Sequence, residues 1–313
     1  MPKLKVLEAL LEELQSLKRQ PVSEESRTVL QQNLQSKLGV VVAKAAEITA
    51  DLGIESLATD LLIAFDRLTR NPVQVDPGCL AKVEIVDALR KLKQREYDLF
   101  VQGSRYEQWE PIWGGQEDRA GHLRGRCALA LAELGYADAL LVIGNMLADP
   151  TVEARMGAAQ AVACYGSTYG IPLLRLRAIG GETSPQVLEV IFTSLLALCQ
   201  PQTQAIEFIA KFLDSEIAEA PAVAAIALGD SRNSEAFQAL QAWIARPTET
   251  ENLRVAFAAM AAMRLPEAFD YLIDAIERGT DVESAIAFES LNIYRGDTAI
   301  WERVETALSN RNS

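Results

Sequence analysis

Aromatic residues and histidine, which often form metal, cofactor and catalytic sites, are scarce in this chain of 313 residues. Only 6% of the residues are aromatic, and His122 is the single histidine. One histidine, with no closely spaced cysteines, does not supply the ligand set of a zinc site. The phosphate-binding patterns GxxxxGK[ST] and GxGxxG and the catalytic patterns GxSxG and HExxH are missing as well. We therefore expect no metal, no cofactor and no catalytic residues.

Long apolar runs are also missing, because no unbroken apolar stretch reaches the roughly 18 residues of a membrane span. The amino-terminal segment MPKLKVLEALLEELQSLKRQ is apolar in part, but Glu8, Glu12 and Glu13 interrupt it. A secretory signal needs an unbroken apolar region followed by a cleavage site, and neither is present. These observations lead us to expect a soluble, cytoplasmic protein that does not bind membranes.

Cysteine is infrequent, and the four cysteines form no CxxC pair. Each falls on or beside the apolar face of an expected helix, which is typical of buried free thiols. Free thiols fit a reducing compartment. The four residues are Cys79, Cys127, Cys164 and Cys199.

Basic residues are too few to balance the acidic ones, with 30 Lys and Arg against 43 Asp and Glu, a net charge of −13. Nucleic acids and anionic membranes are bound by basic surfaces, so we expect neither as a partner. The charge is uneven along the chain. Residues 214–313 carry 8 basic and 17 acidic side chains, whereas residues 82–126 carry 9 and 8 and are the only stretch that is not acidic.

Ala and Leu are abundant, and they occur in a pattern that recurs along the sequence. LRGRCALALAELG ends at Gly135, ARMGAAQAVACYG at Gly166, APAVAAIALG at Gly229 and SAIAFESLNIYRG at Gly296. Each of these segments predicts an apolar helix that ends near a glycine and is followed by a second apolar helix. The steps are about 31 residues or a small multiple, as expected for stacked helix pairs.

These repeats predict an all-α solenoid of about eight helix pairs over residues 39–313, preceded by a capping helix pair over residues 1–38. No segment shows the alternation or turn chemistry of a hairpin, so we expect no strand. We expect Ser23 to cap a helix over 23–38. The expected pairs span 39–70, 79–105, 121–149, 151–180, 184–214, 216–246, 248–279 and 281–308. A leucine stripe on the first helix comprises Leu4, Leu7, Leu10, Leu11, Leu14 and Leu17.

The repeat unit resembles the HEAT family. EARMGAAQAVACYGSTYGIPLLRLRAIGG and ENLRVAFAAMAAMRLPEAFDYLIDAIERG are most similar to the short HEAT-like repeats of many bacterial proteins, including bilin lyase subunits. The segment 105–126 with the following ALALAELGYADALL also resembles uncharacterised bacterial HEAT repeat proteins. The resemblance covers residues 39–308 and implies a right-handed α–α superhelix. It implies no single activity, because such arrays occur in scaffolds, lyase subunits and some DNA glycosylases.

The repeat spacing breaks once. Lys93 and Gly135 are 42 residues apart, about 11 more than one unit of the repeat. The additional residues form an irregular insertion at about 106–120, in which Pro111 and the pair Gly114-Gly115 predict a loop. Aromatic, arginine and histidine side chains gather in and around this insertion: Arg105, Tyr106, Trp109, Trp113, Arg119, His122, Arg124 and Arg126.

Two interpretations of the insertion stay open. In the structural one, Trp109 and Trp113 fold back into a gap in the solenoid, and Arg124 or Arg126 pairs with an acid of a neighbouring repeat. In the functional one, aromatic and arginine side chains hold a partner or an anionic group at the groove edge. Arg175 and Arg177 join this set if the second helix of their pair lines the concave face.

Because no catalytic constellation is present, an enzyme is the less favoured reading. The leading hypothesis is a non-enzymatic scaffold that binds another protein or an extended peptide in its concave groove, with the Trp/Arg loop as anchor. The alternative, implied by the resemblance, is a bilin lyase-like activity or a chaperone for a chromophore or phycobiliprotein. Tyr106, Trp109 and Trp113 would then lie against the ring system of a tetrapyrrole, and the arginines would hold its propionates.

Overall fold

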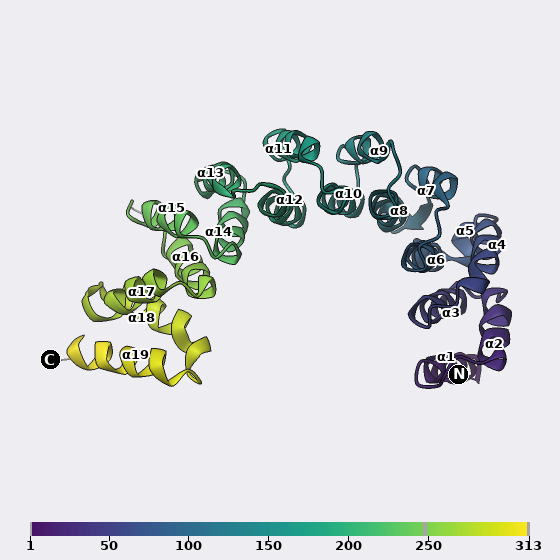
Figure 1. Cartoon of the computed structure of the whole chain (residues 1–313), viewed down its shortest axis with the longest axis horizontal. Helices are drawn as coiled ribbons and strands as arrows, with labels where there is room; N and C mark the ends of the chain where they lie inside the picture. The colour runs from purple at the N-terminus through teal and green to yellow at the C-terminus, as the bar shows by residue number, and fades with distance from the viewer. Residues whose placement is uncertain (1, 247–248, 312–313) are drawn as a thin grey trace. The chain divides into compact units, whose positions relative to one another are not determined.

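The computed structural model describes residues 2–246 and 249–311, with side chains from residue 7 onward, and its fold is all-α apart from one β-hairpin. Its helices form successive pairs, which confirms the all-α expectation (Figure 1). Up to residue 179 the elements are α1 (Pro2–Leu17), α2 (Glu24–Leu34), α3 (Gly39–Asp51), α4 (Ala58–Leu68), α5 (Pro72–Val75), α6 (Leu80–Lys91), α7 (Tyr97–Gly103), β1 (Trp109–Ile112), β2 (Gly115–Asp118), α8 (Gly121–Glu133), α9 (Ala139–Met146), α10 (Val152–Tyr165) and α11 (Ile171–Ile179).

The remaining helices continue the same pattern of pairs. They are α12 (Pro185–Leu198), α13 (Thr203–Ala210), α14 (Ala220–Asp230), α15 (Ser234–Ile244), α16 (Thr250–Met263), α17 (Pro266–Arg278), α18 (Asp281–Leu291) and α19 (Thr298–Arg311).

Local sequence signals account for the helix ends. Ser23 caps α2 as expected, because its side chain accepts from the backbone N–H of Ser26. The helix ends at Leu34, earlier than expected. Gly166 follows α10 with φ +73°, a left-handed conformation that favours glycine. Proline opens α12 and α17, where its missing N–H removes no helical hydrogen bond.

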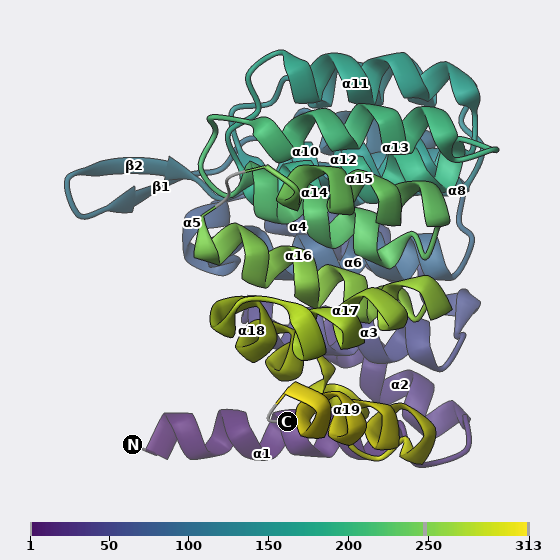
Figure 2. The same ribbon diagram turned by 90° about the vertical axis from the view of Figure 1, so that its left-hand side faces the viewer.

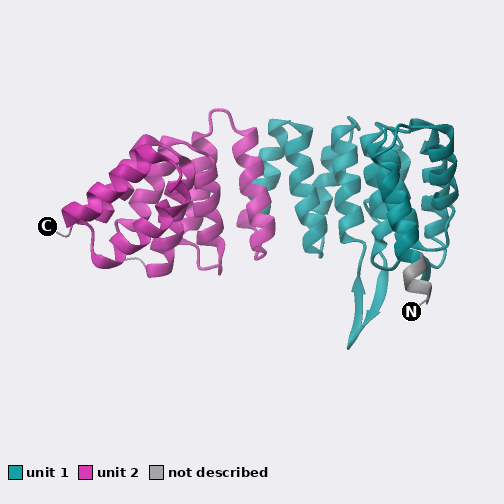
Figure 3. Cartoon of the chain, turned by 90° about the horizontal axis from the view of Figure 1, so that it is seen from below, with its two compact units in different colours: residues 1–177 teal, residues 178–313 magenta. Residues whose placement is uncertain are grey.

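The chain divides into two compact units, residues 1–177 and residues 178–313 (Figure 3). Each unit has two layers of helices. In the first, α3, α6, α8 and α10 follow one another in contact along the inner side of the unit's curve, with α4, α7, α9 and α11 behind them (Figure 1). In the second, α12, α14, α16 and α18 form the corresponding row. The first helix of each pair therefore lines the inner side, and α11, which carries Arg175 and Arg177, belongs to the other layer.

Small residues let the row helices approach closely. A Cβ atom added to Gly157 of α10 would lie 2.3 Å from the Cα of Gly125 in α8, nearer than real Cβ atoms come to other atoms. Nearly every residue of α8 from Leu123 to Ala132 is buried, because helices pack on both of its sides. The Ala-rich composition thus places the core between the helices of one row.

Two expectations from the sequence are wrong. Residues 109–118 form a β-hairpin, in which Trp109 pairs with Asp118 and Ile112 with Gly115, where no strand was expected. The hairpin turns at Trp113 and Gly114, and Gly114 has φ +89°. Cys164 is exposed, whereas Cys79, Cys127 and Cys199 are buried as expected.

At the amino terminus, Leu14 and Leu17 of the leucine stripe are buried, and the side chain of Leu4 lies outside the described part. The division into a cap over 1–38 and a solenoid over 39–313 stays a prediction. None of the described helices is long and apolar enough to cross a membrane.

Candidate functional site

The hairpin projects past the ends of the helices of the first unit (Figure 2). Trp113 at its turn is fully exposed, and Trp109 is 53% exposed. Ile112 is exposed beside them. The tryptophans therefore do not fold back into a gap in the solenoid, which removes that part of the structural interpretation.

Below the exposed strands, Asp118 ties the two ends of the hairpin to α8. Its Oδ1 accepts from the backbone N–H of Gln108 at 2.9 Å and of Ala120 at 3.0 Å. Its Oδ2 accepts from Arg124 Nη1 at 2.6 Å. Burial acts to raise the pKa of Asp118, but these hydrogen bonds outweigh it and hold the pKa below its usual value. Asp118 is therefore held as a carboxylate.

Arg124 is buried, and all five of its N–H groups are used. Two go to Asp149, from Nε to Oδ2 at 2.8 Å and from Nη2 to Oδ1 at 2.9 Å. The others reach Asp118, the carbonyl of Tyr106 at 2.8 Å and Thr151 Oγ1 at 3.1 Å. No donor of Arg124 remains for a ligand. This geometry supports the structural interpretation of Arg124 as the partner of an acid in the next repeat.

A second set of contacts fixes β1 to the turn before α6. Gln108 Nε2 donates to the carbonyl of Asp76 at 2.9 Å and to Glu110 Oε1 at 2.6 Å. Glu110 Oε1 also accepts from the backbone N–H of Gly78 at 2.7 Å. Asp76 in turn pairs with Lys82 Nζ at 2.8 Å, and both side chains are almost completely buried. The hairpin is thus held from two neighbouring repeats.

Cys79 and Tyr106 lie within the same buried region. The Cys79 thiol donates to Gln108 Oε1 at 3.1 Å, and burial raises its pKa to about 12. Burial, with smaller contributions from the charges of Cys79 and Asp76, raises the pKa of Tyr106 to about 12. Neither group is ionised near neutral pH, so both serve as neutral hydrogen-bonding groups. We call these buried contacts the base network: Asp76, Lys82, Gln108, Asp118, Arg124 and Asp149.

One sequence signal for the base network was missed. An aspartate before a helix is followed six positions later by a basic residue three times in the first unit, at Asp76 and Lys82, Asp118 and Arg124, and Asp149 and Arg155. Each pair is in contact. The first two are ion pairs between side chains, and in the third Arg155 Nη1 donates to the backbone carbonyl of Asp149 at 2.9 Å. This spacing identifies buried pairs that the glycine and alanine pattern does not reveal.

The other residues singled out from the sequence are dispersed. Arg119 is exposed and pairs with Glu117 at 2.9 Å, and Arg126 pairs with Asp87 at 3.3 Å. His122 is exposed at the start of α8. Arg175 and Arg177 are half-buried on α11, outside the hairpin and the base network.

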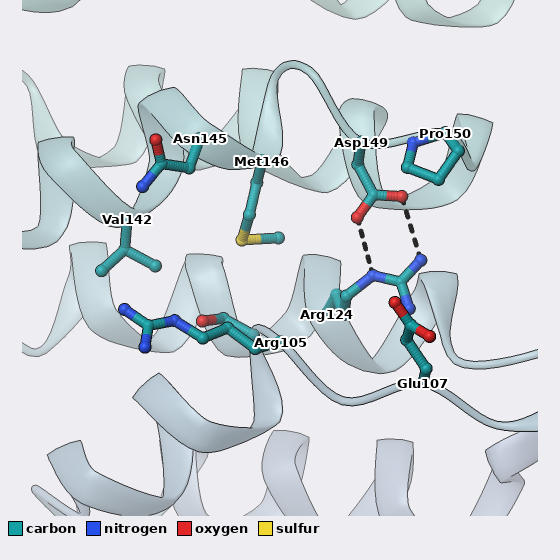
Figure 4. Close-up of a pocket in the computed structure, with 9 residues that line it drawn as sticks. Arg105, Glu107, Arg124, Val142, Asn145, Met146, Asp149 and Pro150 are labelled. Atoms are coloured by element: carbon teal, nitrogen blue, oxygen red, sulfur yellow. Dashed lines mark hydrogen bonds and ion pairs between the residues drawn. The ribbon is translucent and has the colours of Figure 1, made fainter.

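A pocket of about 250 Å³ lies beside the base of the hairpin, between the end of α7 and α9 (Figure 4). Within residues 2–246 and 249–311, no group of His, Cys, Asp and Glu side chains is arranged to hold a metal ion. The pocket is lined chiefly by Arg105, Glu107, Arg124, Val142, Asn145 and Met146.

No family model matches the sequence, and no curated protein matches it. Among solved structures, the complex of CpcE and CpcF of phycocyanin lyase from Nostoc sp. PCC7120 is 19% identical, with 93% of this chain and 97% of that chain covered and a TM-score of 0.39. An engineered protein is 16% identical over 91% of this chain and 88% of its own, with a TM-score of 0.41. Neither similarity assigns an activity or a partner to this chain, and the HEAT-like resemblance stays a prediction.

Proposed function

We propose that this protein is a non-enzymatic module that binds another protein, and that the hairpin is its anchor. The observation that carries the proposal is the exposure of Trp109 and Trp113 on a strand and turn that project into solvent. Covering a tryptophan removes about 150–250 Å² from water. At about 25 cal/mol per Å² this is roughly 4–6 kcal/mol before the costs of association. Tryptophan is also enriched among the residues that dominate interface energies.

The base network supports this role by fixing the hairpin in advance. An isolated two-stranded hairpin is only marginally stable in water. Here Asp118 holds the hairpin to α8, and Gln108 holds it to the turn before α6, through buried and half-buried hydrogen bonds. A hairpin that is already ordered loses less conformational entropy on binding. We therefore place the anchor on the hairpin, with the concave groove as a secondary contact.

The tetrapyrrole alternative finds less support. A cradle for a ring system needs aromatic rings and free arginines around one enclosed space. Trp113 is fully exposed, and the donors of Arg124 are all used within the protein. The described geometry therefore favours contact with a protein surface.

Affinity capture from the native host, followed by quantitative mass spectrometry, tests the proposal. The Trp109→Ala, Trp113→Ala double variant should retain its main partner roughly 30-fold less than the unaltered chain, as expected for loss of interface hot spots. Tyr169→Ala is the matched control, because Tyr169 is an exposed aromatic residue of the same unit outside the hairpin. Equal retention by both variants, with both folded by circular dichroism, would refute the anchor.

A further inference from the structure

The pocket beside the hairpin contains two guanidinium groups that differ in availability (Figure 4). Arg124 uses every donor within the base network. Arg105, at the end of α7, is exposed, and its guanidinium forms no hydrogen bond or ion pair with any residue of the described part of the chain. Arg105 is thus free to bind a group from outside.

Each acidic group that lines the pocket accepts a hydrogen bond from another residue of the protein. Asp149 accepts from Arg124 and from the backbone N–H and hydroxyl of Thr151 at 2.9 and 2.8 Å. Glu107 Oε2 accepts from the indole N–H of Trp109 at 2.9 Å. Across the described residues that line this pocket, Arg105 is therefore the one charged side chain without a partner.

The residues around Arg105 suit a short side chain that ends in a polar group. Val142 and Met146 of α9 present apolar surface, and Asn145 lies between them with an amide that can donate (Figure 4). The volume of about 250 Å³ is below the roughly 300 Å³ at which pockets for drug-sized ligands begin, so it fits a single side chain.

We propose that this pocket takes an acidic side chain, aspartate or glutamate, of the protein that the hairpin anchors, an inference that rests on the proposed function. A planar guanidinium binds a carboxylate through two parallel hydrogen bonds. The methylene groups of the acidic residue lie against Val142 and Met146, and the Asn145 amide donates a further hydrogen bond.

The hairpin and the pocket are adjacent, so one partner segment reaches both. Trp109 donates to Glu107, and Glu107 itself lines the pocket. The segment that covers Trp109 therefore passes the mouth of the pocket. Trp109 and Trp113 supply most of the affinity, and Arg105 selects segments with an acid at a fixed distance from the residue that contacts the tryptophans.

Display of random peptides against the full chain tests the inference without the natural partner. Peptides whose binding depends on Trp109 and Trp113 should share one Asp or Glu. Arg105→Gln should lower their affinity about five- to tenfold, as expected for a charge-assisted pair at a partly exposed site. Arg95→Gln, which changes another exposed arginine of the same unit, should leave it unchanged.

Replacing the acid in the peptide by its amide should cost the same factor, and should cost nothing more when Arg105 is already Gln. Arg105→Glu should restore binding to peptides in which lysine replaces the acid.

The remaining outcomes separate the two proposals. Tryptophan-dependent peptides without an acid, or without coupling to Arg105, would overturn the pocket assignment and leave the hairpin anchor in place. Coupling between the acid and Arg105 without dependence on the tryptophans would overturn the anchor instead. Loss of binding on amidation of the peptide carboxyl terminus would show a terminal carboxylate rather than a side chain. A library that yields no binding peptide would overturn both.

Discussion

The hairpin and the base network contain the same kinds of residue in opposite environments. Trp109 on the hairpin and Arg119 directly after it are exposed, whereas Tyr106 at its base is half-buried and Arg124 is buried. Arg119 has one ion pair with Glu117 at the surface, but Arg124 has five hydrogen bonds inside the protein. These four side chains lie within twenty residues of one another. They nevertheless divide into a structural set, Tyr106 and Arg124, and an accessible set, Trp109 and Arg119.

The irregular segment therefore contains two sets of residues with different roles. The base network makes contacts only within the protein, so its loss should change stability. The side chains of Trp109 and Trp113 on the hairpin make few contacts within the protein, so their loss should change binding alone. Variants of the two sets should separate these effects.

Arg124→Ala should lower the free energy of unfolding of the first unit by about 3–5 kcal/mol, the range for breaking a buried ion pair. The change removes the guanidinium that pairs with the little-exposed carboxylates of Asp118 and Asp149. Urea unfolding followed by circular dichroism measures the loss. Arg70→Ala, which removes an exposed pair with Asp66, should change the free energy by less than about 0.5 kcal/mol. Similar values for both variants would contradict a structural role for Arg124.

Gly157→Ala should destabilise the helix rows by about 1–3 kcal/mol, because the added methyl group meets the backbone of Gly125. The control is Gly144→Ala in α9, where the nearest atom to the new Cβ, Leu173 Cδ1, is 3.8 Å away. That change should be neutral or stabilising, since alanine has the higher helix propensity. If thermal unfolding shows the reverse order, the close approach of α8 and α10 is wrong.

Acid should weaken the base network through Asp118. The folded-state pKa of Asp118 is depressed, so its contribution to stability is present above the unfolded-state pKa of about 3.9 and is lost as pH falls through the folded value. The stability difference between the unaltered chain and Asp118→Asn should therefore shrink as pH falls below about 4. A difference that stays constant from pH 7 to pH 3 would contradict the depressed pKa.

Trp113→Ala should change the free energy of unfolding least, by less than about 0.5 kcal/mol, because the side chain is fully exposed. Chemical denaturation of this variant beside the unaltered chain provides the measurement. Destabilisation comparable to that of Arg124→Ala would mean that the tryptophan packs within the protein, and the comparison between hairpin and base would fail.

The helix pairs were predictable from sequence because each one repeats the same local signals. Alanine-rich faces, glycine after the first helix as at Gly166, and proline at helix starts as at Pro185 all point to the same boundaries. The hairpin was not predictable in this way. Its strands have four residues each, and Pro111 within the first weakens the strand signal.

The position of the candidate site could be predicted from the sequence, but the roles of its individual residues could not. The break in repeat spacing pointed to residues 106–120, and these include both tryptophans. Sequence could not separate Arg105, which is free, from Arg124, which is saturated, because burial depends on residues as distant as Asp149. The six-residue spacing from Asp118 to Arg124 was a readable signal, but its meaning comes from the contacts.

Photo-crosslinking in the native host tests whether the hairpin contacts the partner protein. A photoreactive phenylalanine analogue replaces Ile112 in one variant and Tyr169 in another, since both residues are exposed in the first unit and neither is one of the two anchoring tryptophans. Irradiation should join a distinct partner protein to the chain at position 112 and not at position 169. The absence of a distinct adduct at position 112, or the same adducts at both positions, would contradict the assignment of the hairpin as the binding site.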